Sequence, residues 1–195
     1  MRRPFQFYDG SAFEVPALSV YAAAMSCEPR RLPVLKEKIG VVGAGKIGAA
    51  MMRGIVRAGL VGKNQVMASD VSEQLRDAVV KELDIEATAD NAVLCDFADI
   101  IILAVKPQIV DLVAKEIAKK LGNKKLLVSV AAGVPIARIE ANLEKGARVV
   151  RVMPNIACVV GAGAAGFAGG SHATADDLEK VGAILNSFGV GMPVE

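Results

Sequence analysis

A chain of 195 residues, 53% apolar and 23% charged, is long enough to bury one hydrophobic core, so we expect one domain with an appendage. The net charge of +2 comes from 23 basic and 21 acidic residues without a long basic run, which argues against a nucleic-acid-binding protein. The apolar stretches have the length of strands rather than of membrane spans. We therefore expect neither a nucleic-acid partner nor a membrane partner.

The few cysteines and histidines limit the chemistry that the side chains can supply. Cys27, Cys95 and Cys158 are odd in number and widely spaced, which favours a reducing compartment over a disulfide framework. His172 is the only histidine, and together these four residues form no cluster with metal-ligand spacing. We therefore predict a cytoplasmic protein without a bound metal.

Residues 1–37 differ in character from the rest of the chain. This stretch shows neither helical nor strand periodicity and contains several prolines, so we interpret it as a flexible N-terminal extension. Arg2 and Arg3, followed by an apolar run, faintly resemble a signal peptide, but Asp9 and Glu14 interrupt the pattern. The folded domain is expected to cover residues 38–195.

From residue 38 onward, short apolar runs alternate with helical stretches. In chain order we predict a strand at 39–42, a helix at 47–58, a strand at 65–69, a helix at 72–83, a strand at 85–87, a helix at 91–95, a strand at 100–105, a helix at 107–121, a strand at 126–130, a helix at 135–143 and strands at 147–152 and 164–168. Thr174 and Asp177 then form a capping box for a helix that ends near Ser187, and a last strand starts near Gly189. Strands that are apolar throughout and separated by single helices predict an α/β, Rossmann-type, doubly wound and mostly parallel sheet with helices on both faces.

A Gly-x-Gly-x-x-Gly sequence joins the first predicted strand to the first predicted helix. It consists of Gly43, Ala44, Gly45, Lys46, Ile47 and Gly48. In this context the first glycine permits a tight turn, the second lets the backbone approach a pyrophosphate, and the third lets helix and strand pack closely. Exposed N–H groups and the positive end of the helix then attract the anion. We predict a dinucleotide site here, with a glycine-rich turn that binds no ligand as the alternative.

Asp70 closes the second predicted strand, at the position that reaches the adenosine ribose in this type of fold. A carboxylate there accepts hydrogen bonds from the ribose hydroxyls and repels a 2′-phosphate, which favours NADH. Arg76, about one helical turn further along, could instead bind that phosphate and permit NADPH. The alternative is that Asp70 merely caps the next helix. The predicted cofactor is therefore NADPH or NADH.

Four segments occur in the order and spacing seen in pyrroline-5-carboxylate reductases. They are residues 39–48, 104–108, 129–134 and 151–155. Over residues 38–195 the chain thus resembles the N-terminal domain of this family, a cofactor domain like that of 6-phosphogluconate dehydrogenases. The resemblance implies an enzyme of proline biosynthesis, which uses NADPH or NADH to reduce the C=N bond of 1-pyrroline-5-carboxylate to L-proline.

The resemblance also implies which residues line the site. Two segments after the fourth and fifth predicted strands would contact the cofactor: Ala104, Val105, Lys106 and Pro107, and Ala131, Ala132 and Gly133. Asn91 matches a family position near the cofactor, and Asn155, the one candidate for a catalytic role, belongs to a loop that would face the nicotinamide and the substrate. A cyclic imine is basic enough to be partly protonated near neutral pH, so its reduction needs positioning more than a strong protein acid.

Members of the family continue into a helical C-terminal domain, which binds the substrate carboxylate and forms a homo-oligomer. No such segment is found in residues 1–195, so we expect this chain alone to bind the dinucleotide but to reduce the imine poorly. Two other functions stay open. One is a non-catalytic NAD(P)-binding module, and the other is a related reductase that acts on another imine or on a deazaflavin.

Overall fold

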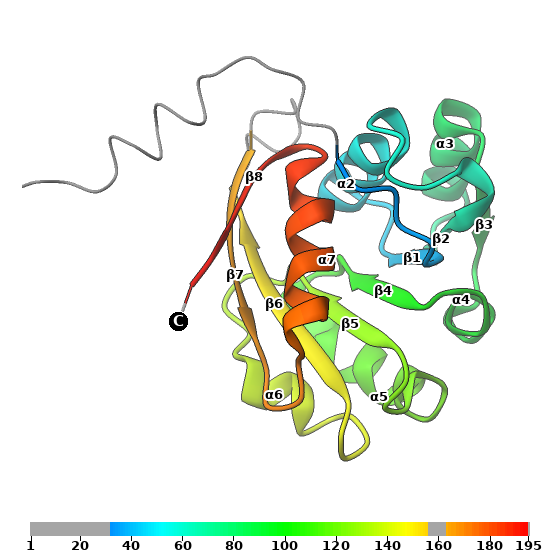
Figure 1. Cartoon of the computed structure of the whole chain (residues 1–195). Coiled ribbons are helices and arrows are strands. Elements are labelled where there is room, and N and C mark those ends of the chain that lie inside the picture. The colour runs from blue at the N-terminus through cyan, green and yellow to red at the C-terminus, as the bar shows by residue number, and fades with distance from the viewer. Residues whose placement is uncertain (1–31, 156–162, 195) are drawn as a thin grey trace, which may run out of the picture. The chain divides into compact units, whose positions relative to one another are not determined.

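The folded unit of this computed structural model starts at Leu32, and the structure describes residues 32–155 and 163–194. Its centre is an eight-stranded sheet with the strand order β3-β2-β1-β4-β5-β6-β7-β8 (Figure 1). The strands are β1 (Ile39–Val42), β2 (Val66–Ser69), β3 (Glu86–Thr88), β4 (Ile100–Leu103), β5 (Leu126–Ser129), β6 (Arg148–Pro154), β7 (Gly163–Gly169) and β8 (Gly189–Pro193). These strands agree closely with those predicted from the apolar runs.

The sheet is parallel from β3 to β6, and its register is continuous. Val42 at the end of β1 lies opposite both Ser69 of β2 and Leu103 of β4. Only β7 pairs in antiparallel fashion with β6, and β8 then pairs in parallel with β7. The predicted mostly parallel, Rossmann-type sheet is therefore confirmed.

Helices cover both faces of the sheet. They are α2 (Lys46–Arg57), α3 (Glu73–Leu83), α4 (Asn91–Phe97), α5 (Val110–Leu121), α6 (Ile136–Glu140) and α7 (Ala175–Asn186), with short 3-10 turns at η1 (Lys63–Gln65) and η2 (Pro107–Ile109). Buried side chains of α2, α3 and α7 belong to one hydrophobic cluster, and those of α4, α5 and α6 belong to another. In Figure 1, α7 lies in front of the sheet and α5 and α6 lie behind it. None of the helices in the described ranges has the length and apolar character needed to span a bilayer.

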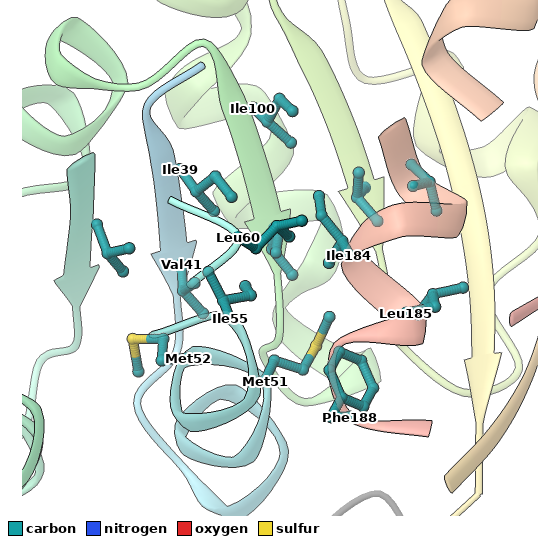
Figure 2. Packing of buried hydrophobic residues seen from close by; sticks show 14 of the residues in the cluster. Ile39, Val41, Met51, Met52, Ile55, Leu60, Ile100, Ile184, Leu185 and Phe188 are labelled. Atoms are coloured by element: carbon teal, nitrogen blue, oxygen red, sulfur yellow. The ribbon is translucent and has the colours of Figure 1, made fainter. Parts of the chain in front are cut away.

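Alternating side chains of the strands supply both hydrophobic clusters. All four residues of β1 are buried; Ile39 and Val41 face the α2–α7 side, and Val42 faces the α4–α6 side. Figure 2 shows the first cluster, in which Met51 of α2 lies beside Phe188, a residue between α7 and β8. Burial on both faces explains why these strands are continuous apolar runs.

The bounds of several elements differ from the sequence-based expectations; α6, for example, ends at Glu140 rather than at residue 143. Strand β4 ends at Leu103 rather than at residue 105, and the helix predicted from Pro107 begins as the 3-10 turn η2. The capping box before α7 is confirmed, because Thr174 Oγ1 accepts the N–H of Asp177 at 3.2 Å and Asp177 Oδ2 accepts the N–H of Thr174 at 2.9 Å.

Residues 32–37, which the sequence analysis assigned to the extension, lie against the described domain. Leu35 is buried in the first hydrophobic cluster, and its N–H donates to the carbonyl oxygen of Leu60 at 2.8 Å. The carboxylate of Glu37 pairs with the Lys180 ammonium at 2.7 Å. The folded unit thus begins a few residues before β1.

Candidate dinucleotide site

The strand order changes direction between β1 and β4. Strands β2 and β3 lie on one side of β1, and β4, β5 and β6 lie on the other. The loops after β1 and β4 therefore leave toward helices on opposite faces of the sheet, and in folds of this type ligands bind at such a switch point, beyond the carboxyl ends of the strands. Backbone hydrogen bonds connect these strand ends. Gly43 N–H donates to the Ser69 carbonyl oxygen at 2.7 Å, and Ala104 N–H donates to the Val42 carbonyl oxygen at 2.8 Å.

Two glycines of the turn between β1 and α2 are required by the packing of the chain itself. Gly43 has a φ of +102°, and a Cβ there would lie 2.6 Å from the carbonyl oxygen of Ala104. A Cβ on Gly48 would collide with the carbonyl oxygen of Gly43. Larger residues at either position would therefore force the turn away from β4 or from α2.

Gly45 is different, because none of the residues that the structure describes requires a glycine there. Its φ of −68° and ψ of −170° suit any residue, and a Cβ built on it would meet no atom of residues 32–155 and 163–194 within 4 Å. The space above Gly45 is open, so a glycine at this position is explained by a ligand that comes close to the backbone rather than by the fold.

The first turn of α2, like those of α5 and α6, lacks the side-chain cap that α3, α4 and α7 possess. Ser72, Asp90 and Thr174 each accept a backbone N–H at the start of α3, α4 and α7, respectively. At α2 the cap position is Gly45, which offers no side chain, and the first turn contains no acidic residue. The N–H groups and positive dipole end of α2 thus face the open space above Gly45 without a neutralising carboxylate on the same helix.

The carboxylate of Asp70 connects the glycine turn to helix α3. Its Oδ2 accepts the N–H of Ala44 at 2.8 Å, and its Oδ1 accepts the N–H of Ser72 at 2.9 Å. The helix cap of α3 is Ser72 itself, so Asp70 supports the start of that helix without being its cap residue. Each carboxylate oxygen keeps capacity for a further hydrogen bond, which a ribose hydroxyl can use.

Asn91 lies at the first position of α4, and both ends of its side chain are already engaged. Its Oδ1 accepts the hydroxyl of Ser69 at 2.6 Å, and its Nδ2 donates to the carboxylate of Glu116 at 3.2 Å. Sequence reasoning did not identify Ser69 and Glu116. The available signal was Ser69, a polar residue at the end of an otherwise apolar strand. One N–H of Asn91 is left for a ligand.

The segments after β4 and β5 lie at the same edge of the sheet as the glycine turn. A Cβ on Gly43 would come within 3.3 Å of the Val105 nitrogen, and Val130 N–H donates to Leu103 at 3.1 Å. Exposure varies along these segments: Lys106, Ala132 and Gly133 are exposed, Ala104, Val105 and Pro107 are partly buried, and Ala131 is buried. The structure thus brings together the segments that the resemblance assigned to the cofactor.

Asn155 stands at the end of β6 and ties this strand to β7. Its backbone N–H donates to the Ala164 carbonyl at 3.1 Å, and its Oδ1 accepts the Ala164 N–H at 3.2 Å. The side chain is exposed, at the same end of the sheet as the glycine turn. Cys158, one of the three cysteines counted in the sequence, lies outside the described residues.

The remaining reactive side chains do not gather at this edge. Burial raises the pKa of the Cys95 thiol to about 11, which keeps it protonated and unreactive at neutral pH. His172 is exposed in the loop that precedes α7. Within residues 32–155 and 163–194, no group of three or more His, Cys, Asp or Glu side chains could hold a metal ion.

Comparisons with known proteins agree with this geometry. Residues 38–133 match the family described as NADP oxidoreductase, coenzyme F420-dependent. A pyrroline-5-carboxylate reductase of Methanosarcina acetivorans is 43% identical over 158 residues, which are 81% of this chain and 58% of the relative. Pyrroline-5-carboxylate reductase 3 of Mus musculus is 37% identical over 168 residues, 86% of this chain and 58% of the relative.

Solved structures lead to the same family. A pyrroline-5-carboxylate reductase from Coxiella burnetii aligns with a TM-score of 0.80 and 28% identity, over 83% of this chain and 60% of that one. The Plasmodium falciparum pyrroline carboxylate reductase, whose crystal structure has NADP bound, aligns with a TM-score of 0.74 and 29% identity, over 83% of this chain and 59% of that one. This chain spans 58% of the length of the two curated relatives. By sequence and by fold, the chain is therefore similar to part of the pyrroline-5-carboxylate reductases of these organisms.

Proposed function

We propose that this chain binds NADPH or NADH at the turn formed by residues 43–48 and provides the cofactor half of a pyrroline-5-carboxylate reductase. The observation that carries the proposal is Gly45, a glycine that faces open space and that the fold does not need. A pyrophosphate seated over Gly45 would accept the N–H groups at the start of α2, which have no acidic residue beside them in that turn.

The other residues of this edge fit the remaining parts of a dinucleotide. Asp70, at the end of β2, has lone pairs left for the ribose hydroxyls. The segments 104–107 and 131–133 follow β4 and β5, where this type of fold places the nicotinamide half of the cofactor. We propose that Asn155, exposed at the end of β6, faces the substrate side.

The proposed reaction transfers a hydride to the imine carbon of 1-pyrroline-5-carboxylate and yields L-proline. The bound nicotinamide supplies the hydride, while the protein binds, orients and shields the reactants. Exclusion of water and alignment of the two partners account for most of the catalytic effect in such a reaction. We also propose a cytoplasmic location, which the free, buried thiol of Cys95 supports.

A second candidate function is suggested by the matched family description, which names coenzyme F420. That match covers residues 38–133, whereas the similarity to pyrroline-5-carboxylate reductases extends over 158 residues. The additional similarity beyond the cofactor segments favours the imine substrate. Incubating the chain with NADPH and either oxidised F420 or the imine, beside a full-length relative, distinguishes the two functions by which compound is reduced.

The direct test of the binding site is Gly45→Val. The variant should fold as the wild type does, since its Cβ meets no atom of the described part of the chain within 4 Å. Its affinity for both dinucleotides, measured by fluorescence titration, should fall by at least tenfold, because a side chain would occupy the place of the pyrophosphate.

Gly182→Ala on α7 is the matched control for a milder Gly45→Ala variant. A Cβ on Gly182 makes only an ordinary contact, 3.6 Å from the ring of Phe167. Gly182→Ala should bind both dinucleotides like the wild type, whereas Gly45→Ala should weaken binding. Equal affinities for Gly45→Val and the wild type would refute the assignment of the turn.

A further inference from the structure

A short series of hydrogen bonds leads from the glycine turn to helix α5. The carbonyl oxygen of Ser69, the last residue of β2, accepts the N–H of Gly43 at 2.7 Å. The Ser69 hydroxyl lies 2.6 Å from Asn91 Oδ1, and Asn91 Nδ2 lies 3.2 Å from Glu116 Oε2 on α5. Ser69 is fully buried, whereas Glu116 is exposed. The series thus joins the candidate dinucleotide site to a residue outside it.

The chemistry of the groups fixes the direction of each side-chain hydrogen bond. A carboxylate only accepts, so the Asn91 amide must present its NH2 group to Glu116 and its oxygen to Ser69. The Ser69 hydroxyl, which is able to donate or accept, must then donate. Without Glu116 the two ends of the amide are free to exchange places, because a hydroxyl satisfies either of them. Glu116 therefore decides that Asn91 offers an N–H to a ligand.

Glu116 has no other side-chain hydrogen bond and no ion pair within the described ranges. Helix α4 does not need it as a cap, because Asp90 Oδ1 accepts the N–H of Ala92 at 2.7 Å. A carboxylate near the start of α4 is favourable for the helix dipole, but any anion there has that effect. The specific contact of Glu116 is the one with the Asn91 amide.

We infer that Glu116 is a positioning residue for dinucleotide binding, which orients Asn91 so that its free N–H meets an acceptor oxygen of the adenosine half. This inference rests on the proposed function, since it requires the dinucleotide to lie over the glycine turn. The end of β2 is where this type of fold brings the adenosine ribose. A side chain that is ordered before the ligand arrives loses less entropy on binding, which is worth about two- to tenfold in affinity.

A double-mutant cycle in binding tests the inference, because a residue that acts through Asn91 has no effect on affinity once Asn91 is replaced. Glu116→Ala should weaken the affinity for NADH and for 5′-ADP by about fivefold in fluorescence titrations. In the Asn91→Ala background, the same substitution should change these affinities by less than about twofold. The control is Glu179→Ala, which replaces an exposed glutamate of α7 and should bind like the wild type.

Nuclear magnetic resonance of the side-chain amides supplies a second readout, which a loss of stability alone would not change. In the protein without ligand, the Nδ2 proton of Asn91 that is bound to Glu116 should resonate apart from those of the exposed Asn123. Glu116→Ala should move it toward the Asn123 signals, while NADH should shift the other Nδ2 proton of Asn91 in the wild type. The spectra need only the Glu116 variant, so they test the inference even where Asn91→Ala folds poorly.

The outcomes are distinguishable. An equal loss of affinity from Glu116→Ala in both backgrounds would show that Glu116 acts through the fold rather than through Asn91, and would overturn the inference. An unchanged NADH affinity in Glu116→Ala, or unchanged Asn91 amide signals, would overturn it as well. In these cases the proposed function would stand, because the wild type still binds a dinucleotide. A wild-type protein that binds neither NADH nor NADPH would overturn the proposed function and the inference together.

Discussion

The two edges of the parallel sheet differ in how their charged and polar groups are paired. At the amino edge, where the strands begin, charged side chains satisfy one another: Arg148 pairs with Asp177 at 2.7 Å, and Lys180 pairs with Glu37 at 2.7 Å. At the carboxyl edge, the first turn of α2 has no side-chain cap and Arg76 has no ion-pair partner among the described residues. The amino edge thus stabilises the chain, and the carboxyl edge is left ready to bind a ligand.

Asp177 is the residue of the amino edge whose charge is best compensated, although the buried Nε of its partner Arg148 has no hydrogen-bond partner among the described residues. Its side chain is only 2% exposed, and its carboxylate accepts hydrogen bonds from Arg148, from the Thr174 hydroxyl and from the Thr174 N–H. A buried carboxylate is tolerated only with such partners, because its desolvation is costly. The ion pair also connects α7 to the beginning of β6.

The largest effect is expected when this buried pair is broken. Asp177→Ala should lower the free energy of unfolding by about 3 kcal/mol, since it removes the partner of Arg148 and the reciprocal bond of the capping box. Dinucleotide affinity should be unchanged, because the variant lies at the opposite edge from the glycine turn. Urea unfolding and NADH titration of the same samples measure both quantities.

Asp176→Ala is the control for that variant. Asp176 is 65% exposed and pairs with Lys180, so its removal should cost less than about 1 kcal/mol. A similar loss of stability in both variants would contradict the special role of the buried pair, and weakened NADH binding in Asp177→Ala would contradict the separation of the two edges.

Two glycines of the turn at residues 43–48 test the same contrast between structural support and ligand binding. Gly48→Ala should destabilise the domain by about 1–3 kcal/mol, because its Cβ collides with the backbone of Gly43. Gly45→Ala should change stability by less than about 1 kcal/mol, since its Cβ meets nothing within 4 Å. Thermal unfolding without ligand distinguishes them, and the reverse order of stabilities would show that the turn is built differently.

The smallest effect concerns the pH dependence of the Glu37–Lys180 pair. The hydrogen bond from Lys180 holds the pKa of Glu37 below its ordinary value of 4.5, although burial partly opposes the shift. The folded state thus favours the charged carboxylate, and this stabilisation is complete above pH 4.5 and disappears as the pH falls through the lower folded pKa. The difference in unfolding free energy between the wild type and Glu37→Gln should therefore shrink below pH 4.5.

Glu179→Gln serves as the control for this measurement. Glu179 lies on α7 beside Lys180 and forms no ion pair among the described side chains. The difference in unfolding free energy between Glu179→Gln and the wild type should not show the pH dependence expected for Glu37→Gln. A Glu37→Gln difference that stays constant from pH 6 to pH 3 would show that Lys180 does not stabilise the charged carboxylate.

Local patterns in the sequence predicted most of the fold. The strand expected at 39–42 has those bounds in the structure, because a wholly apolar run lies between Lys38 and Gly43. The capping box of Thr174 and Asp177 was also predictable, since both partners lie within one helical turn. The antiparallel direction of β7 could not be predicted, because a strand of glycine, alanine and one phenylalanine has no clear pattern of faces.

The candidate site was predicted in outline but not in its connections. Sequence spacing brought the glycine turn, Asp70 and the segments after β4 and β5 to one edge, where the structure also has them. The bond from Ala44 N–H to Asp70 joins residues 26 apart, and no local pattern shows it. The contacts from Arg76 Nη1 to the carbonyl oxygens of Asp70 and Val71 likewise depend on the path of the loop. Cofactor binding by these residues stays a prediction.

The position of β1 between β2 and β4 has a consequence for synthesis on the ribosome. Ile39 pairs with Val66 on one side and with Ile100 on the other, so the second partner is made 61 residues after Ile39. If the ribosome adds roughly 5–20 residues per second, one edge of β1 has no partner strand for about 3–12 s. During that time the strand Ile39–Val42 exposes unpaired backbone and apolar side chains, the features that promote strand addition between nascent chains. A chaperone that shields short apolar segments would therefore be needed most before β4 has emerged.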